Sequence, residues 1–113
     1  MTTCNCAILL SEFTAFDANQ RGNVNLLEWA TASEENNKGF DIERSTNGNN
    51  WQKIAFVQGN GTTVNTSEYN FEDTKVEPNI LYYYRLKQLD FDAKFEYSNI
   101  VEATIQTIEQ PNN

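Results

Sequence analysis

The fold class is decided by one stretch of the chain, Tyr82-Tyr83-Tyr84-Arg85-Leu86-Lys87. Successive side chains of a β-strand point to opposite faces, so the first, third and fifth residues of this stretch share one face. The other three share the opposite face. The same period of two runs through residues 39–45, where Phe40 and Ile42 alternate with Asp41 and Glu43. This alternation predicts strands with one buried face.

Working outward from these two segments, turn residues arrive at near-regular intervals between short apolar runs, which is typical of an all-β sandwich or barrel. We predict seven strands, at residues 8–18, 24–32, 39–45, 51–58, 67–72, 80–89 and 94–105. Asn47-Gly48 is the strongest hairpin signal, because both residues tolerate a positive φ. Residues 31–34 match a helix capping box, but no amphipathic run follows them, so we assign them to a strand end and the loop after it.

The predicted fold is therefore an all-β, seven-stranded antiparallel sandwich of the immunoglobulin-like or fibronectin type III-like kind, and 113 residues suffice for one such domain. Trp29 is expected to be the most deeply packed side chain. The residues predicted to fill the core are Leu27, Trp29, Phe40, Ile42, Ile54, Phe71, Tyr82, Tyr84, Leu86 and Ile100.

Composition excludes several classes of function. The net charge is −8, so the surface repels phosphate backbones, and neither nucleic acid nor an anionic membrane surface is an expected partner. The chain has no histidine, which removes the commonest catalytic triads and histidine zinc sites. No apolar run is long enough to cross a bilayer, so membrane insertion is not expected, and the N-terminus does not read as a signal peptide.

Two blocks of sequence carry a resemblance to a known family. The first runs from Leu27 through Glu34 to Gly39-Phe40-Asp41-Ile42-Glu43-Arg44-Ser45, and the second is residues 83–90, closed by residues 95–98. Together they resemble the fibronectin type III-like domain found near the C-terminus of bacterial proteins exported by the type IX secretion system. The resemblance covers about residues 8–105, with residues 1–7 as an N-terminal extension and 106–113 as a C-terminal tail.

The resemblance implies a secreted or cell-surface protein and a spacer or adhesion module that has no catalytic residues and needs no cofactor. No sorting domain follows residue 105 in this sequence. Ala93 stands where the family usually has glycine in the turn before the last strand, and we expect that turn to be remodelled.

Cys4 and Cys6 are the most unusual residues of the N-terminal extension. In an extended chain their Cα atoms lie about 6.5–7 Å apart, at the edge of the disulfide range, so a bond between them would be strained. Three readings stay open: free thiols, an intermolecular disulfide from one or both, or half of a metal site. No further cysteine or histidine exists to complete tetrahedral zinc within one chain.

Two carboxylate pairs invite a chemical reading. Asp90 and Asp92 suggest a calcium loop, but the further oxygen ligands of an EF-hand are absent, and turn-stabilising aspartates are the favoured interpretation. Glu34 and Glu35 are adjacent, and adjacent strand residues face opposite ways, so they cannot flank one glycosidic bond. We interpret Glu34 and Glu35 as solvated charges. We predict no catalytic residue and no metal-binding residue in the chain.

Trp51, Tyr83 and Tyr97 are candidates for an exposed aromatic platform that binds sugar rings, although strands prefer aromatic residues in any case. The favoured function is a non-catalytic extracellular structural or adhesion module that contacts other protein domains. Two alternatives remain. One is a self-assembling subunit that adds its N-terminal segment, about residues 1–10, to the sheet edge of another copy. The other is a polysaccharide-binding module.

Overall fold

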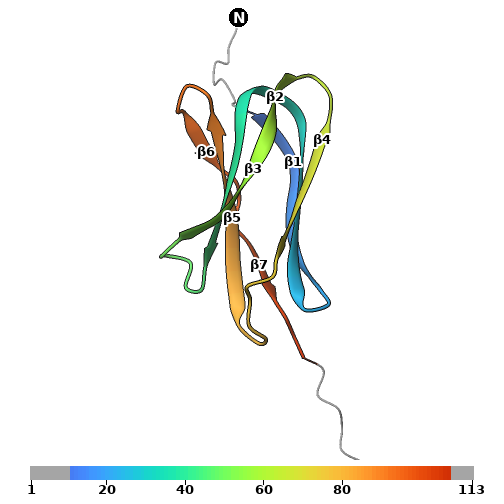
Figure 1. The fold of residues 1–113 in the computed structure, drawn as a ribbon, viewed down its shortest axis with the longest axis vertical. Coiled ribbons are helices and arrows are strands. Elements are labelled where there is room, and N and C mark those ends of the chain that lie inside the picture. Colours follow the sequence, from blue (N-terminus) through green and yellow to red (C-terminus); the bar gives the residue numbers. More distant parts are fainter. Residues whose placement is uncertain (1–10, 108–113) are drawn as a thin grey trace, which may run out of the picture.

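The computed structural model describes residues 11–107 of the chain, and the side chains of residues 13–107. This part of the chain forms seven β-strands and no helix, and every strand pairing is antiparallel, so the all-β prediction is confirmed. The strands, shown in Figure 1, are β1 (Ser11–Arg21), β2 (Val24–Ser45), β3 (Gln52–Thr63), β4 (Ser67–Asp73), β5 (Leu81–Asp90), β6 (Phe95–Tyr97) and β7 (Val101–Thr104).

The strand β2 organises the whole fold. Its first half pairs with β1 on one side and β4 on the other, and its second half pairs with β3 and β5. The two strands predicted at 24–32 and 39–45 are therefore one bent strand, and the predicted loop between them is wrong. The bend keeps its pairing with β3 through register shifts around Asn37. Asn36 adopts a φ of +56°, and a side chain at Gly39 would collide with the Phe56 ring.

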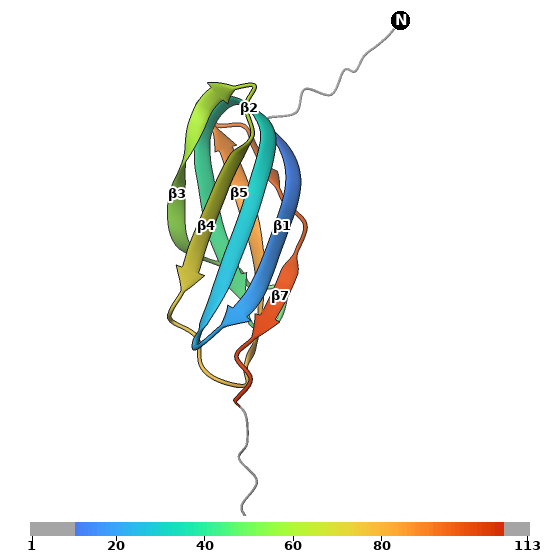
Figure 2. The same ribbon diagram turned by 90° about the vertical axis from the view of Figure 1, so that its right-hand side faces the viewer.

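Because β2 belongs to both halves of the fold, the strands form one continuous hydrogen-bonded sheet that curls on itself. β5 continues the sheet by pairing with β6 and β7, and β7 comes to lie beside β1, as Figure 2 shows. The structure confirms the antiparallel sheet and the single core of the predicted sandwich, but the strands form one curled sheet. The two separate sheets of the prediction are joined here through β2.

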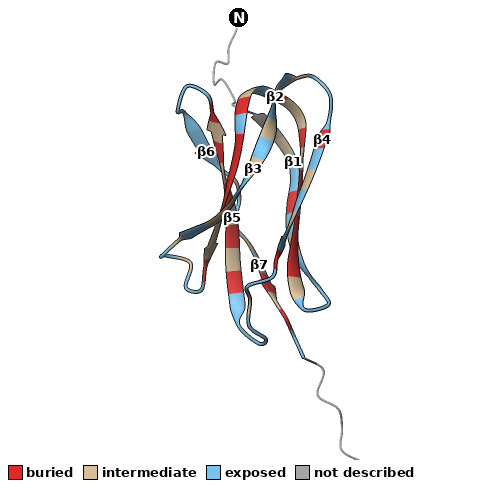
Figure 3. Cartoon of the chain, in the orientation of Figure 1, coloured by how far each residue is buried: buried red, intermediate tan, exposed pale blue. Residues whose placement is uncertain are grey.

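Aromatic rings fill the space inside the curl. Trp29, predicted to be the most deeply packed side chain, is 2% exposed, whereas Phe40 and Tyr84 are 0% exposed. Its ring contacts Phe16, Phe40 and Tyr69 at centroid distances of 6.3, 5.5 and 5.6 Å. Buried positions concentrate along β2 and β5 (Figure 3). Of the predicted core residues, the buried ones are Leu27, Trp29, Phe40, Ile42, Tyr82, Tyr84 and Leu86, and Ile54 and Phe71 pack against them half-buried. The prediction did not include Phe16, Leu26, Ala103 and Ile105, which are also buried.

Ile100 is 53% exposed, so its assignment to the core is wrong. The predicted strand at 94–105 is interrupted at residues 98–100, where the Leu86 N–H donates to the Ser98 hydroxyl at 2.8 Å. Continuing the β6 register would place Ile100 opposite Tyr84, but β7 pairs Val101 with that residue. A shift of one residue turns every later side chain to the other face, and so Val101 takes the place expected for Ile100.

Two turns differ from their sequence signals in instructive ways. At Asn47-Gly48 only the glycine has a positive φ, +78°. The asparagine instead uses its side-chain oxygen to accept the N–H groups of residues 49 and 50, at 2.8 Å each, so the turn is longer than two residues. In the β5–β6 turn Ala93 itself adopts the left-handed conformation, with φ +73°, and its N–H donates to the Asp90 carbonyl at 3.0 Å.

Candidate functional site

The outer face of β3, the second half of β2, β5 and β6 carries most of the exposed aromatic side chains, and we call it the aromatic face. Strand alternation builds it. Tyr84, Leu86 and Gln88 of β5 point into the core, so the residues between them point outward. Register then places Arg85 of β5 beside Glu43 of β2, and Lys87 of β5 beside Tyr97 of β6.

Rings and cations alternate along this face in what we call the cation–aromatic stack, formed by Trp51, Arg85, Tyr97, Lys87 and Phe95. The Arg85 guanidinium lies 4.3 Å from the Trp51 ring centroid and 4.0 Å from that of Tyr97. The Lys87 ammonium lies 4.3 Å from the Phe95 centroid and 6.0 Å from that of Tyr97. Such contacts stabilise by about 0.5–1 kcal/mol each at exposed sites, and together they fix long side chains in one arrangement.

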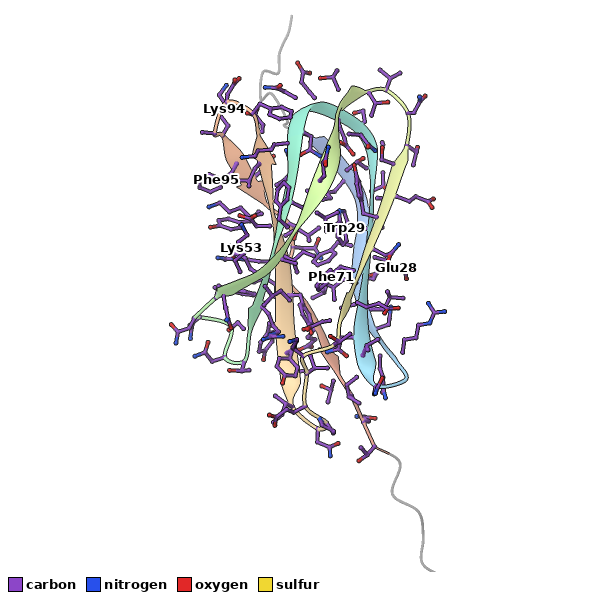
Figure 4. All side chains as sticks on the ribbon, in the orientation of Figure 1. Glu28, Trp29, Lys53, Phe71, Lys94 and Phe95 are labelled. Carbon is purple, nitrogen blue, oxygen red and sulfur yellow. The ribbon has the colours of Figure 1, made fainter. Side chains whose placement is uncertain are left out.

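Charge is distributed unevenly within the aromatic face. Arg85 is held by Glu43 at 2.6 Å, and Lys53 by Asp41 at 3.2 Å. Lys87 forms no salt bridge among residues 13–107. Asp41 lies opposite it in register but is paired with Lys53, and the Lys87 ammonium lies over the Phe95 ring. Figure 4 shows Lys53, Lys94 and Phe95 along one flank of the molecule.

Trp51, Tyr83 and Tyr97, the three residues predicted to bind sugar rings, do not form one open aromatic surface. Trp51 and Tyr97 lie on the two sides of the Arg85 guanidinium, which contacts a face of each ring. Tyr83 is half-buried and packs toward Gly48. Sequence reasoning placed Arg85 and Lys87 on the same face as Tyr83 but assigned them no role, and it missed Phe95, which is 51% exposed. The alternation of β5 was the signal that could have found Arg85 and Lys87.

A buried carboxylate lies at the bend of β2. Glu34 is 3% exposed, so its interpretation as a solvated charge is wrong. Its two oxygens accept hydrogen bonds from the Thr31 and Tyr69 hydroxyls, the Asn37 side-chain amide and the Asn60 backbone N–H, at 2.5–2.9 Å. Burial acts to raise the pKa of this carboxyl, but the four hydrogen bonds outweigh burial and hold the pKa below its usual range. The network thus joins β2, β3 and β4 around one negative charge.

Glu34 is predicted to be solvated, at a strand end or in the loop after it, whereas the bend of β2 surrounds its carboxylate with hydrogen-bond donors. Thr31 and Glu34 share the spacing of a capping box, and here the Thr31 hydroxyl donates to the Glu34 carboxylate within a strand. Burial, together with the hydrogen bond to Glu34, raises the pKa of Tyr69 above its ordinary range. Glu35, the neighbour of Glu34, is exposed as predicted for a solvated charge.

A second buried network lies at the other end of β2. Arg44 contacts both carboxylate oxygens of Asp73 at 2.9 and 3.0 Å. The Tyr84 hydroxyl donates to the same carboxylate at 2.7 Å and accepts from the Asn25 amide at 3.0 Å. Burial and the contact with Asp73 raise the pKa of Tyr84. Both oxygens of the Asp73 carboxylate accept hydrogen bonds within the fold, so this arrangement serves to fix strands.

Of the remaining residues singled out in the sequence, Asp90 and Asp92 lie within the described part of the chain, and Cys4 and Cys6 lie outside it. Asp90 is buried, and its side chain accepts the Asp92 N–H at 2.6 Å, which is a turn-stabilising contact. Among the described residues there is no group of three or more side chains suited to hold a metal ion. Cys4, Cys6 and the N-terminal segment proposed for strand addition lie outside the described residues. No helix of the described chain is long and apolar enough to cross a membrane.

Comparison with known proteins places the fold. No protein-family model and no curated protein matches the chain. Among solved structures, a Fn3-like protein from Clostridium thermocellum matches with a TM-score of 0.63 and 22% identity, over 90% of this chain and 100% of that protein. The fold is fibronectin type III-like.

Parts of larger proteins match as well. Pectate lyase PelI from Erwinia chrysanthemi, solved with tetragalacturonic acid, has a TM-score of 0.65 and 21% identity, over 81% of this chain. A β-1,2-glucanase from Parabacteroides distasonis has a TM-score of 0.60 and 19% identity, over 92% of this chain. This chain spans 28% of the lyase and 13% of the glucanase, and at these identities the likeness concerns the fold alone.

Proposed function

We propose that this chain is a non-catalytic, extracellular structural or adhesion module that acts through protein–protein contacts, and that the aromatic face makes those contacts. The observation that carries the proposal is the cation–aromatic stack. Phe95 and Tyr97 are 51% and 43% exposed on a face that also holds Trp51 and Arg85. Tryptophan, tyrosine and arginine are the residues enriched at interaction hot spots, and an exposed apolar patch on a soluble domain marks a binding surface.

Preorganisation supports the same proposal. Binding costs free energy when long side chains lose freedom at an interface, about 0.5–1.5 kcal/mol for each. In this fold Arg85 is already held between two rings and by Glu43, and Lys87 already lies over Phe95. A partner therefore meets side chains whose freedom is already restricted.

The comparisons support the non-catalytic part of the proposal. The Clostridium thermocellum protein is spanned over its full length by the match with this chain, which supports a module without catalytic machinery of its own. The lyase and the glucanase each contain a similar fold within a longer chain. We infer a secreted or cell-surface protein, exported by the type IX secretion system, from the resemblance in residues 27–45 and 83–98.

Polysaccharide binding is the second candidate, because exposed rings and polysaccharide-cleaving neighbours both favour it. Stacking of a sugar requires a free ring face. Arg85 covers one face of Trp51 and of Tyr97, and Lys87 lies over Phe95, so the stack leaves less open ring surface than a sugar platform needs. We rank it below protein contact for that reason.

Site-directed photo-crosslinking in the producing organism tests the proposal. We would place p-benzoylphenylalanine at position 97, in the aromatic face, and at position 64 as a control, since Val64 is 88% exposed in the β3–β4 turn. The expected result is a discrete protein adduct from position 97, absent from position 64 and strongly reduced by Phe95→Ala. Equal adducts from both positions, or adducts to glycan without peptide, would overturn the proposal.

The polysaccharide candidate has its own measurement. Electrophoretic migration in gels containing polygalacturonate or β-1,2-glucan should be unchanged relative to gels without polymer, for the wild type and for Trp51→Ala alike. Retardation of the wild type that disappears in Trp51→Ala would replace protein contact with polysaccharide binding as the function of the aromatic face.

A further inference from the structure

A second outer face, formed by β1, the first half of β2 and β4, is strongly acidic. Outward-pointing Asp17, Glu28, Glu68 and Glu72 define what we call the acidic face, and strand alternation places them all outside the core. The first half of β2 and all of β4 contain neither lysine nor arginine. A hollow of about 440 Å³ lies within this face, with Ala15 and Ala30 among its lining residues and Asp17, Glu28 and Glu68 around them.

The carboxylates of the acidic face form no salt bridge in the described chain, and Arg21, at the end of β1, is the one lysine or arginine in β1, the first half of β2 and β4. Asp17 and Glu28 are direct cross-strand partners, and like charges in that position destabilise a sheet. The three salt bridges found in the described part of the chain are Arg44–Asp73, Lys53–Asp41 and Arg85–Glu43, so none of them involves the acidic face. A cation supplied from outside would relieve this repulsion.

The aromatic face offers such a cation. Lys53 and Lys87 both lie next to Asp41, which is paired with Lys53, so Lys87 forms no salt bridge within the described residues. It lies at one end of the stack, over the exposed Phe95 ring. The two faces are on opposite flanks of the molecule, as Figure 4 shows from the positions of Phe95 and Lys53 on one flank and Glu28 on the other. A chain therefore cannot satisfy its own acidic face with its own stack.

We propose that the aromatic face of one copy of this chain binds the acidic face of a second copy. The Lys87 ammonium would meet the carboxylates of Asp17 and Glu28, and the Phe95 ring would enter the hollow that Ala15 and Ala30 help to line. This inference rests on the proposed function, because it uses the same aromatic face and names its partner. It joins opposite charges and places an exposed ring on small apolar side chains.

The symmetry of this contact has a consequence for assembly. The contact joins two different faces, so it is heterologous, and a pair keeps a free acidic face on one copy and a free aromatic face on the other. Heterologous contacts between opposite flanks add copies in one direction and give open chains unless the rotation closes a ring. The net charge of −8 makes copies repel at long range, and at 0.15 M salt this repulsion is screened beyond about 8 Å.

Sedimentation equilibrium of the purified full chain at 0.15 M salt tests the proposal with two charge reversals, Lys87→Glu in the aromatic face and Glu28→Lys in the acidic face. The wild type should associate to species larger than a dimer as concentration rises. Each reversal alone should weaken association by about tenfold or more, because it opposes like charges across the contact. Lys38→Glu and Glu35→Lys, two exposed sites at the β2 bend, are matched controls and should associate like the wild type.

Mixing gives the sharpest outcome. The Lys87→Glu variant keeps a native acidic face, and the Glu28→Lys variant keeps a native aromatic face, so an equal mixture of the two should recover association that neither shows alone. Association of Glu28→Lys at the wild-type level would point to two aromatic faces in contact and would overturn the inference. So would a mixture that stays monomeric. Lys87→Gln, which removes the charge without reversing it, checks that the effect is electrostatic if Lys87→Glu folds poorly.

Failure here is separable from failure of the proposed function. A wild type that stays monomeric at every concentration rejects the second copy as partner. If position 97 still crosslinks to a different protein, the aromatic face remains a protein-contact surface. If position 97 crosslinks to nothing, both proposals fail together.

Discussion

Replacing Glu34 with glutamine should destabilise the domain by about 2–4 kcal/mol at pH 7. The substitution keeps the shape of the side chain but removes the charge that strengthens all four of its hydrogen bonds, and bonds to a charged group contribute about 1.5–3 kcal/mol each against about 1 for neutral ones. One end of the amide also becomes a donor, so it must face Thr31 and Tyr69, whose hydroxyls can turn to accept. Their own hydrogens then lose their acceptor.

Urea unfolding followed by tryptophan fluorescence measures this effect. With a slope of about 1–3 kcal/mol/M for a small domain, the midpoint should fall by on the order of 1–2 M. The matched control is Glu35→Gln, which removes the same charge from the exposed neighbouring position and should change the free energy of unfolding by less than about 0.5 kcal/mol.

The pH dependence gives a second, independent reading. The folded protein lowers the pKa of Glu34, so the charged form is favoured by folding and its contribution is complete above the unfolded pKa of about 4.3. That contribution is lost as the pH falls through the lower folded pKa. The difference between wild type and Glu34→Gln should therefore be constant from pH 6 to 8 and shrink below about pH 4. A cost under 0.5 kcal/mol, or one equally large at pH 3 and pH 7, would refute the buried-charge account.

Three further changes test the packing. Trp29→Ala should cost about 3–5 kcal/mol, because the ring is 2% exposed and contacts three other rings, and a loss below about 1 kcal/mol in urea unfolding would contradict that. Tyr84→Phe should cost about 1–3 kcal/mol, since it leaves the buried Asn25 amide without its acceptor, whereas Tyr83→Phe should be nearly neutral. Ala93→Gly should raise the free energy of unfolding by about 0.5–1 kcal/mol by relieving a positive φ, and a decrease would show that the turn is unstrained.

The alternation of apolar and polar residues was enough to predict the buried face of strands in which one face is apolar and the other polar. In β5 the outward and inward residues alternate without interruption, and the predicted inward set of Tyr82, Tyr84 and Leu86 is buried. Alternation failed where the backbone inserts a residue. The one-residue shift between β6 and β7 turned Ile100 outward, and no side-chain pattern in residues 94–105 marks the position where Ser98 takes over a backbone hydrogen bond.

The bend of β2 shows a second limit. Polar residues at 31–37 read as a loop because loops are where unpaired polar groups find water. Here Thr31, Glu34 and Asn37 satisfy one another and bind β3 and β4. Such a network depends on residues far apart in the chain, as with Tyr69, which contacts Glu34 across 35 positions. A single sequence gives no local signal for that partner.

The two buried networks explain why the aromatic face can act as a fixed surface. Both lie on β2, one around Glu34 at the bend and the other around Asp73 and Arg44 near its end, and the segment between them carries Asp41 and Glu43 on its outer side. These two carboxylates hold Lys53 and Arg85, so these two cations of the aromatic face are anchored to a strand segment that is itself fastened at both ends. Weakening either network should therefore loosen the cation–aromatic stack before the core melts. Because the ordering of these side chains comes from folding, it does not have to be supplied by the partner.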